Sequence, residues 1–214
     1  MRRKLGRIFK RVANGLGDRV RGEESKTAKW LRAGRPNPPP SAIKARNILV
    51  LADLFEIDTL VETGTNRGTM IAATLDRFKT IYSIEIDPGL AKAAQARFQA
   101  NNGVHILLGD SAKTLPEIMP SLPDKVVFWL DGHYSGPGTG KGDVETPILA
   151  EIETIASQRR DCDDVTIIDD ARLFGQDRDY PPLEDFLQVL KDRFGKQVLV
   201  ADDSIFVLPI HHRH

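Results

Sequence analysis

Acidic and glycine residues stand at the points where short apolar runs end, and these residue types can do chemistry. The positions are Glu62 with the glycines that follow it, Glu85, Asp110, Asp131, and the pair Asp169 and Asp170. Carboxylates accept hydrogen bonds from hydroxyl groups and bind hard cations. Glycines let the backbone turn tightly and come close to a ligand. The pattern therefore predicts one ligand site assembled from several strand ends.

The first glycine segment reads Glu62-Thr-Gly-Thr-Asn-Arg-Gly68, with glycines four residues apart. This spacing differs from the dinucleotide fingerprint G-x-G-x-x-G, and by itself it also suits a purely structural turn. Glu85 follows 17 residues after Gly68, where a carboxylate can accept hydrogen bonds from both ribose hydroxyls of a nucleoside. The alternative is a solvated carboxylate at a strand end. Asp110 could meet an adenine edge, or Asp110 or Ser111 could cap a helix.

Strand-like and helix-like segments alternate from Ala42 onward. Strands are expected at 59–62, 80–85, 104–108, 126–131, 165–169, 197–201 and 204–208, and helices at 42–55, 68–78, 88–99, 115–119, 147–158 and 183–193. Such alternation predicts a mostly parallel sheet covered on both faces, and Asp202-Asp203 suits a closing antiparallel hairpin. Ligands of such sheets bind beyond the carboxyl ends of the strands, where the acids stand.

The ordered set from Thr59 to Asp131 resembles the class I S-adenosylmethionine (SAM)-dependent methyltransferases. It consists of E-x-G-x-x-x-G, an acid ending the second strand, G-D-S-A after the third and Asp ending the fourth. The resemblance implies an α/β, Rossmann-like, doubly wound, mostly parallel seven-stranded sheet with an antiparallel last strand. In that family the glycine turn cradles the methionine part of SAM, the second-strand acid holds the ribose, and the third-strand Asp contacts adenine. The resemblance thus assigns cofactor contacts to Glu62, Gly64, Thr65, Gly68, Glu85, Asp110 and Ser111.

A metal site is the second expectation. Asp131 and the pair Asp169-Asp170 end strands that are neighbours in this class of sheet, about 4.8 Å apart. Three converging carboxylates suit Mg²⁺ or a similar divalent cation, although rim acids and helix caps are the alternative. Because alternate strand residues face opposite ways, both members of the pair can bind one ion only if the chain turns there. The pattern resembles the metal-dependent O-methyltransferases of the macrocin and novobiocin type, in which the matching aspartates hold the metal.

His133 lies two residues after Asp131 and is a candidate general base for a hydroxyl acceptor, where related enzymes place a base candidate. A hydrogen-bonded strand end or a metal ligand are the alternatives for this histidine. The glycine-rich segment 136–142 lacks the Gly and the Ser or Thr that a phosphate-binding loop requires, and is expected to be a lid whose Lys141 touches substrate. Segment 172–182, which contains Tyr180, is expected to form another wall of the pocket.

The net charge of zero hides an asymmetry. Residues 1–32 hold 11 Lys and Arg against three acids, so the remaining chain carries an excess of eight acids. We expect a basic amphipathic arm at 1–32, a proline-rich linker at 33–41 and a methyltransferase domain at 42–210. The arm suits an anionic membrane surface; nucleic acid is the less favoured partner, because aromatic stacking residues are not interleaved with the basic ones. No role in catalysis is expected for His211, His212 and His214.

These observations predict a SAM-dependent methyltransferase that transfers a methyl group to a hydroxyl of a small molecule or glycan with Mg²⁺ assistance. A cytoplasmic protein, peripheral at a membrane and able to form homo-oligomers, is expected; no apolar run reaches the ~20 residues of a membrane span. Two alternatives stay open at this point: a cephalosporin-hydroxylase-like or other non-methylating Rossmann-like protein, and a nucleic-acid methyltransferase or binder that uses the basic arm.

Overall fold

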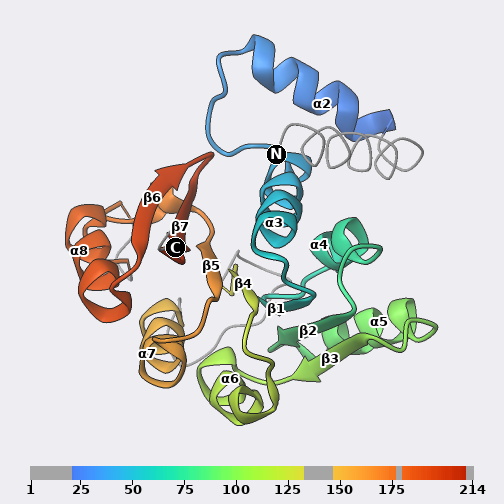
Figure 1. Cartoon of the computed structure of the whole chain (residues 1–214). Coiled ribbons are helices and arrows are strands. Elements are labelled where there is room, and N and C mark those ends of the chain that lie inside the picture. The colour runs from blue at the N-terminus through green and yellow to red at the C-terminus, as the bar shows by residue number, and fades with distance from the viewer. Residues whose placement is uncertain (1–20, 133–146, 177–179, 211–214) are drawn as a thin grey trace.

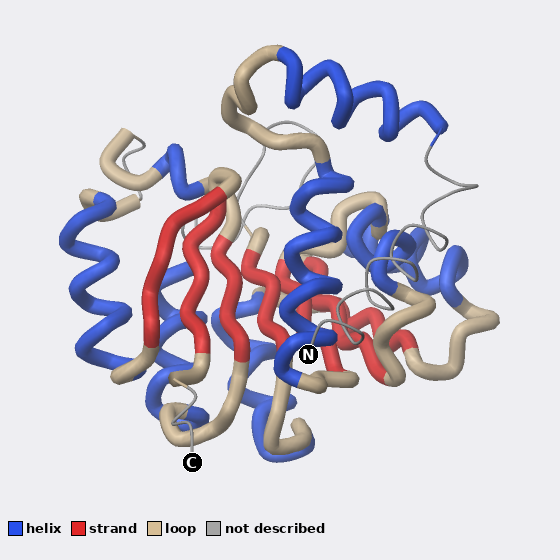
Figure 2. Tube along the Cα trace, turned by 45° about the horizontal axis from the view of Figure 1, so that its top comes forward, coloured by secondary structure: helices blue, strands red, loops and turns tan. Residues whose placement is uncertain are grey.

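A computed structural model describes residues 21–132, 147–176 and 180–210. Within them a single seven-stranded sheet runs through the molecule in the order β3-β2-β1-β4-β5-β7-β6 (Figures 1 and 2). The strands are β1 (Thr59–Thr63), β2 (Thr80–Glu85), β3 (Val104–Leu108), β4 (Val127–Leu130), β5 (Val165–Ile168), β6 (Gln197–Ala201) and β7 (Ser204–Leu208).

The α-helices precede or connect these strands. They are α2 (Arg21–Arg32), α3 (Ser41–Phe55), α4 (Thr69–Thr74), α5 (Pro88–Phe98), α6 (Ser111–Ile118), α7 (Ile148–Arg159) and α8 (Leu183–Phe194), and short 3-10 turns η1 (Met119–Ser121) and η2 (Ala171–Leu173) follow α6 and β5. None of the helices in the described ranges is long and apolar enough to cross a membrane.

Strands β1 to β5 pair in parallel, whereas β7 runs antiparallel to both β5 and β6. The expected doubly wound sheet with an antiparallel last strand is therefore confirmed, and Asp202-Asp203 makes the β6–β7 turn. The strand predictions were accurate to one or two residues. Helix α4 is shorter than expected, because the turn before it extends to Gly68 and the chain leaves the helix after Thr74.

Two apolar layers hold the helices against the sheet. Residues of α3, α4 and α5 pack on one face, and residues of α6, α7 and α8 pack on the other (Figure 2). The central strands β1, β4 and β5 are buried along their whole length, as expected for parallel strands covered on both sides. The carboxyl ends of β1, β2, β4 and β5 therefore point to the same edge, and this edge carries the site.

Candidate functional site: a glycine turn beside an acid cluster

The turn after β1 needs glycine at both predicted positions. Gly64 has φ +85°, and a Cβ atom there would overlap the carbonyl oxygen of Asp131 and lie 2.9 Å from its carbonyl carbon. Gly68 has φ +66°, and its Cβ would lie 2.6 Å from the ring of Phe98. Side chains at these positions would be strained and would clash. The turn thus lies directly against the end of β4, where Asp131 begins the acid cluster.

Glu62 and Thr65 lie behind this turn and are almost completely buried. The Ser83 hydroxyl donates a hydrogen bond to Glu62, and the Oγ atoms of Thr65 and Ser83 are 2.6 Å apart. Burial raises the pKa of Glu62 to about 8, and the Ser83 hydrogen bond offsets this only in part. Both side chains therefore brace the turn from inside, and their direct contact with a cofactor stays a prediction.

Glu85 ends β2 and fixes the same turn from the other side. Its Oε2 accepts a hydrogen bond from the backbone N–H of Asn66 at 2.7 Å, and its Oε1 accepts one from the backbone N–H of Asp87 at 2.9 Å. A carboxylate oxygen has two lone pairs, so each oxygen keeps one acceptor position for a hydroxyl group. Glu85 is thus a fixed strand-end carboxylate with the acceptor capacity that ribose binding requires.

The acid after β3, Asp110, caps a helix, which was the alternative to an adenine contact. Asp110 is the N-cap of α6, and its Oδ1 accepts a hydrogen bond from the backbone N–H of Ala112 at 3.0 Å. Ser111, the first residue of that helix, is buried. The capping role does not occupy the second carboxylate oxygen with a backbone group, and the adenine contact stays a prediction.

Asp131, Asp169 and Asp170 converge at the ends of β4 and β5. These strands are paired in parallel, and one side-chain oxygen from each of the three carboxylates lies within 4.8 Å of the others. The chain turns sharply at Asp170, which has φ +56°, immediately after β5 ends at Ile168. This turn meets the condition under which consecutive aspartates can serve one site.

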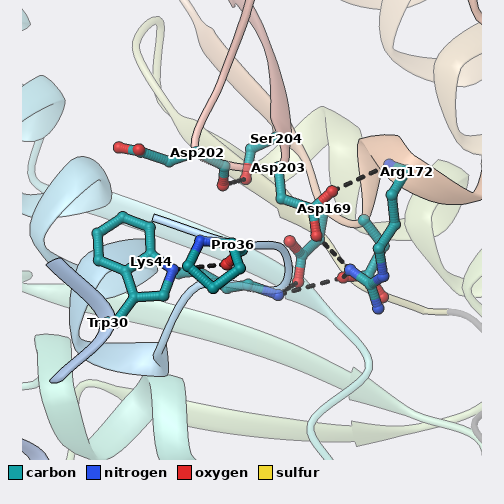
Figure 3. Close-up of polar contacts among 9 residues, drawn as sticks. Trp30, Pro36, Lys44, Asp169, Arg172, Asp202, Asp203 and Ser204 are labelled. Carbon is teal, nitrogen blue, oxygen red and sulfur yellow. Dashed lines mark hydrogen bonds and ion pairs between the residues drawn. The ribbon is translucent and has the colours of Figure 1, made fainter. Parts of the chain in front are cut away.

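Lys44 of α3 reaches into this cluster, and the sequence analysis missed it. Its ammonium group donates to Asp169 (Figure 3) and lies 3.2 Å from Asp170 Oδ1. Burial alone would lower the pKa of Lys44, but Asp169 and Asp170 outweigh it and raise that pKa. The distance along the chain, 125 residues between Lys44 and Asp169, hides this pairing from any local pattern.

Arg172 forms the outer part of the same network. Its Nη1 donates to Asp170 Oδ1 at 2.7 Å and also to Asp203 of the β6–β7 turn (Figure 3). The backbone N–H of Arg172 donates to the other oxygen of Asp203 at 3.0 Å. The network thus ties α3, the end of β5 and the last hairpin together.

The acid cluster offers the donor atoms that a divalent cation prefers. Among the described residues, the carboxylates of Asp131, Asp169, Asp170 and Asp203 outnumber the basic side chains of Lys44 and Arg172. Asp169 Oδ1 is buried and makes no hydrogen bond within the described part of the chain. Burial, followed by the charges of Asp131 and Asp170, raises the pKa of Asp169 to about 7. All-oxygen donors and a buried oxygen that has no hydrogen bond among the described residues fit a hard divalent ion.

A small cavity opens beside the cluster, between the ends of β4 and β5 and the start of α7. Its lining comprises Leu130, Asp131, Gly132, Ile148, Glu151, Ile168, Asp169 and Tyr180. Tyr180 was expected at a pocket wall, but Glu151 was not singled out, because one glutamate in an amphipathic helix carries no local signal. Glu151 is 1% exposed, and burial raises its pKa to about 7, with the nearby Ser111 and Thr63 hydroxyls offsetting this only in part. The cavity therefore joins the acid cluster to a second buried carboxyl group.

The remaining predicted site residues, His133 and the glycine-rich segment 136–142 with Lys141, lie outside the described residues. The terminal His211, His212 and His214, for which no catalytic role is expected, also lie outside them. Most of the basic arm, residues 1–20, also lies outside them. The base role of His133 and the lid therefore stay predictions.

Comparison with known proteins identifies the fold of this chain but does not identify its substrate. No family model matches the sequence. A probable ribosomal RNA small subunit methyltransferase A of Methanosarcina mazei is 33% identical over 95 residues, which are 44% of this chain and 33% of that protein. The chain thus spans about a third of the length of this relative.

Two solved structures align over most of their length. The O-methyltransferase from Bacillus cereus, in complex with S-adenosylhomocysteine (SAH), has a TM-score of 0.58 at 13% identity over 92% of this chain and 96% of that one. The SAH-bound Podospora anserina methyltransferase PaMTH1 has a TM-score of 0.57 at 16% identity over 87% of each chain. The order of the strands, the glycine turn after β1 and these two alignments all point to the same fold. The chain has the fold of the class I SAM-dependent methyltransferases.

Proposed function

We propose that the protein is a SAM-dependent methyltransferase that methylates a hydroxyl group with the assistance of a divalent cation. The observation that carries this proposal is the close approach of Gly64 to Asp131. It sets a turn suited to cofactor binding directly against a cluster suited to a hard cation. A methyl donor on the turn and an acceptor oxygen at the cluster would then be neighbours, and positioning of the two reactants supplies much of such a rate enhancement.

The chain's own residues would divide the work as follows. Glu85 would accept hydrogen bonds from the ribose, and the glycine turn would hold the methionine part of the cofactor. Asp131, Asp169 and Asp170 would hold the cation, which when bound supplies positive charge that favours the deprotonated form of a hydroxyl. His133 would accept the hydroxyl proton as the methyl group arrives.

A second candidate function follows from the partial relative. That relative is named as a probable methyltransferase of small-subunit ribosomal RNA, which makes RNA a second acceptor class for this chain. The basic segment 1–32 would supply phosphate contacts in that case. An RNA base nitrogen would have no need of the acid cluster, so the two candidates differ in how they depend on Asp131 and Asp169.

The deciding experiment measures transfer of labelled methyl groups from SAM. Acceptors would be a panel of hydroxylated small molecules and glycans on one side and small-subunit ribosomal RNA on the other, each with Mg²⁺ or with EDTA. We expect transfer to a hydroxylated acceptor that is lost with EDTA and in Asp131→Asn and Asp169→Asn, but retained in the control Glu153→Gln, an exposed acid of α7. Transfer to RNA that survives EDTA and both substitutions would instead favour the second candidate.

A further inference from the structure

Lys44 is held in the acid cluster by its surroundings. Its side chain is 14% exposed, and its neighbours on α3, Ala45 and Ile48, are buried in the core. The backbone N–H of Ile43 donates to the carbonyl of Pro40 at 2.8 Å, which fixes the start of the helix. The packing around Lys44 therefore fixes its ammonium group at the acid cluster, whereas the ammonium group of a surface lysine is solvated.

The segment before α3 is also anchored. Trp30 is buried and its indole N–H donates to the carbonyl of Pro36 at 2.6 Å (Figure 3). Arg35 pairs with Asp202 of the β6–β7 turn, and Asn47 of α3 donates to the same carboxylate at 3.2 Å. These contacts hold the segment before α3, and α3 itself at Asn47, against the β6–β7 turn. The backbone that carries Lys44 is therefore fixed near Asp169.

We propose that Lys44 is the resident counter-ion of the acid cluster and sets its affinity for a divalent cation. The proposal rests on the metal-assisted function proposed above. Lys44 brings one positive charge to the three converging carboxylates, pairs with Asp169 and shares Asp170 Oδ1 with Arg172. A cation that binds Asp131 and the unpaired Asp169 Oδ1 would meet the repulsion of this ammonium at short range.

Two consequences follow from this arrangement. Without a cation, Lys44 acts together with Arg172 to reduce the repulsion among the carboxylates, so the folded site is stable when empty. With a cation, Lys44 weakens binding, so that loading is reversible and depends on cation concentration. Removing the lysine charge should therefore tighten cation binding and destabilise the cation-free protein.

The test is a Mn²⁺ titration of the full chain, with free Mn²⁺ measured by electron paramagnetic resonance. Lys44→Met is compared with wild type, with Lys44→Arg, which keeps the charge, and with Arg46→Met. Arg46 is an exposed cation of the same helix, so its variant changes the net charge equally. We expect Lys44→Met to bind Mn²⁺ about tenfold more tightly or more, and both controls to stay within about twofold of wild type.

Thermal unfolding gives a second readout. In the absence of a cation, Lys44→Met should unfold at a lower temperature than wild type. Added Mn²⁺ should raise the unfolding temperature of Lys44→Met more than that of wild type. Equal or weaker Mn²⁺ binding by a folded Lys44→Met would overturn the proposal while leaving the metal site intact. Absence of Mn²⁺ binding in every variant would overturn the metal site as well, and SAH binding by the same samples tests the methyltransferase part separately.

Discussion

The Cα atom of Gly64 lies so close to the backbone of Asp131 that a side chain at Gly64 would overlap the Asp131 carbonyl oxygen. The two residues directly follow different strands, β1 and β4, which are paired in parallel. The contact therefore fixes the distance between the turn proposed to hold the cofactor and the cluster proposed to hold the acceptor. It makes this glycine a geometric requirement of the site.

Gly64→Ala should lower the free energy of unfolding by about 2 kcal/mol or more and weaken SAH binding by about tenfold or more. The cost combines a positive φ with the overlap at Asp131. Urea unfolding and calorimetric SAH binding measure the two effects. The matched control is Gly34→Ala: Gly34 has φ +83° but open space around its Cβ, so only the backbone strain of about 1 kcal/mol applies. Equal losses in the two variants would contradict the proposed close approach.

Glu151→Gln should change how stability depends on pH. Burial raises the folded-state pKa of Glu151 from 4.5 to about 7, so the folded protein binds this proton more tightly than the unfolded chain does. The stabilising contribution is complete below about pH 4.5 and is lost as the pH rises through 7. The variant should therefore come close to wild type near pH 5 and exceed its unfolding free energy at pH 8 by roughly 3 kcal/mol.

Urea unfolding at several pH values between 5 and 8 checks this expectation. Glu153→Gln serves as the control, because Glu153 lies on the same helix but is about half exposed. A pH profile of Glu151→Gln that runs parallel to the wild-type profile would show that the buried carboxyl group does not hold its proton more tightly in the folded state.

Arg159→Met should destabilise the fold by about 3 kcal/mol or more while leaving the SAH affinity unchanged. Arg159 binds the buried Asp164 with two hydrogen bonds, of 2.7 and 2.9 Å, at the end of the sheet opposite the site. Removing the guanidinium leaves an uncompensated buried carboxylate that also accepts the backbone N–H of Val126. Arg193→Met breaks a pair exposed by more than half and should cost under about 0.5 kcal/mol. Comparable losses in the two variants, or a weakened SAH affinity in Arg159→Met, would argue against this separation of stability from function.

Much of this architecture follows from local patterns. The alternation of short apolar runs and helical segments predicted the sheet, and the residues at strand ends predicted the edge that carries the site. The sequence predicted that Asp131, Asp169 and Asp170 lie close together, because neighbouring parallel strands end at the same edge of a sheet. The turn at Asp170 that makes this convergence work was stated only as a condition, since a positive φ at an aspartate has no reliable local signal.

The missed residues share one physical cause. Lys44 and Glu151 lie on helices whose sequences look ordinary, and each becomes distinctive only through partners distant in the chain. A lysine near the start of a helix is usually solvated, and a glutamate within one usually is too. What reveals them is burial, and burial of a charged group depends on the tertiary packing of α3 and α7 against the sheet edge.

The most direct measurement of the central claim is isothermal titration calorimetry with SAM and SAH, with and without Mg²⁺. Wild type and Glu85→Ala are compared with Glu117→Ala, which removes an exposed acid of α6. We predict micromolar binding of both ligands by wild type and by Glu117→Ala, and a loss of about tenfold or more in folded Glu85→Ala, because Glu85 would hold the ribose hydroxyls. Folded wild-type protein that binds neither SAM nor SAH would contradict the account.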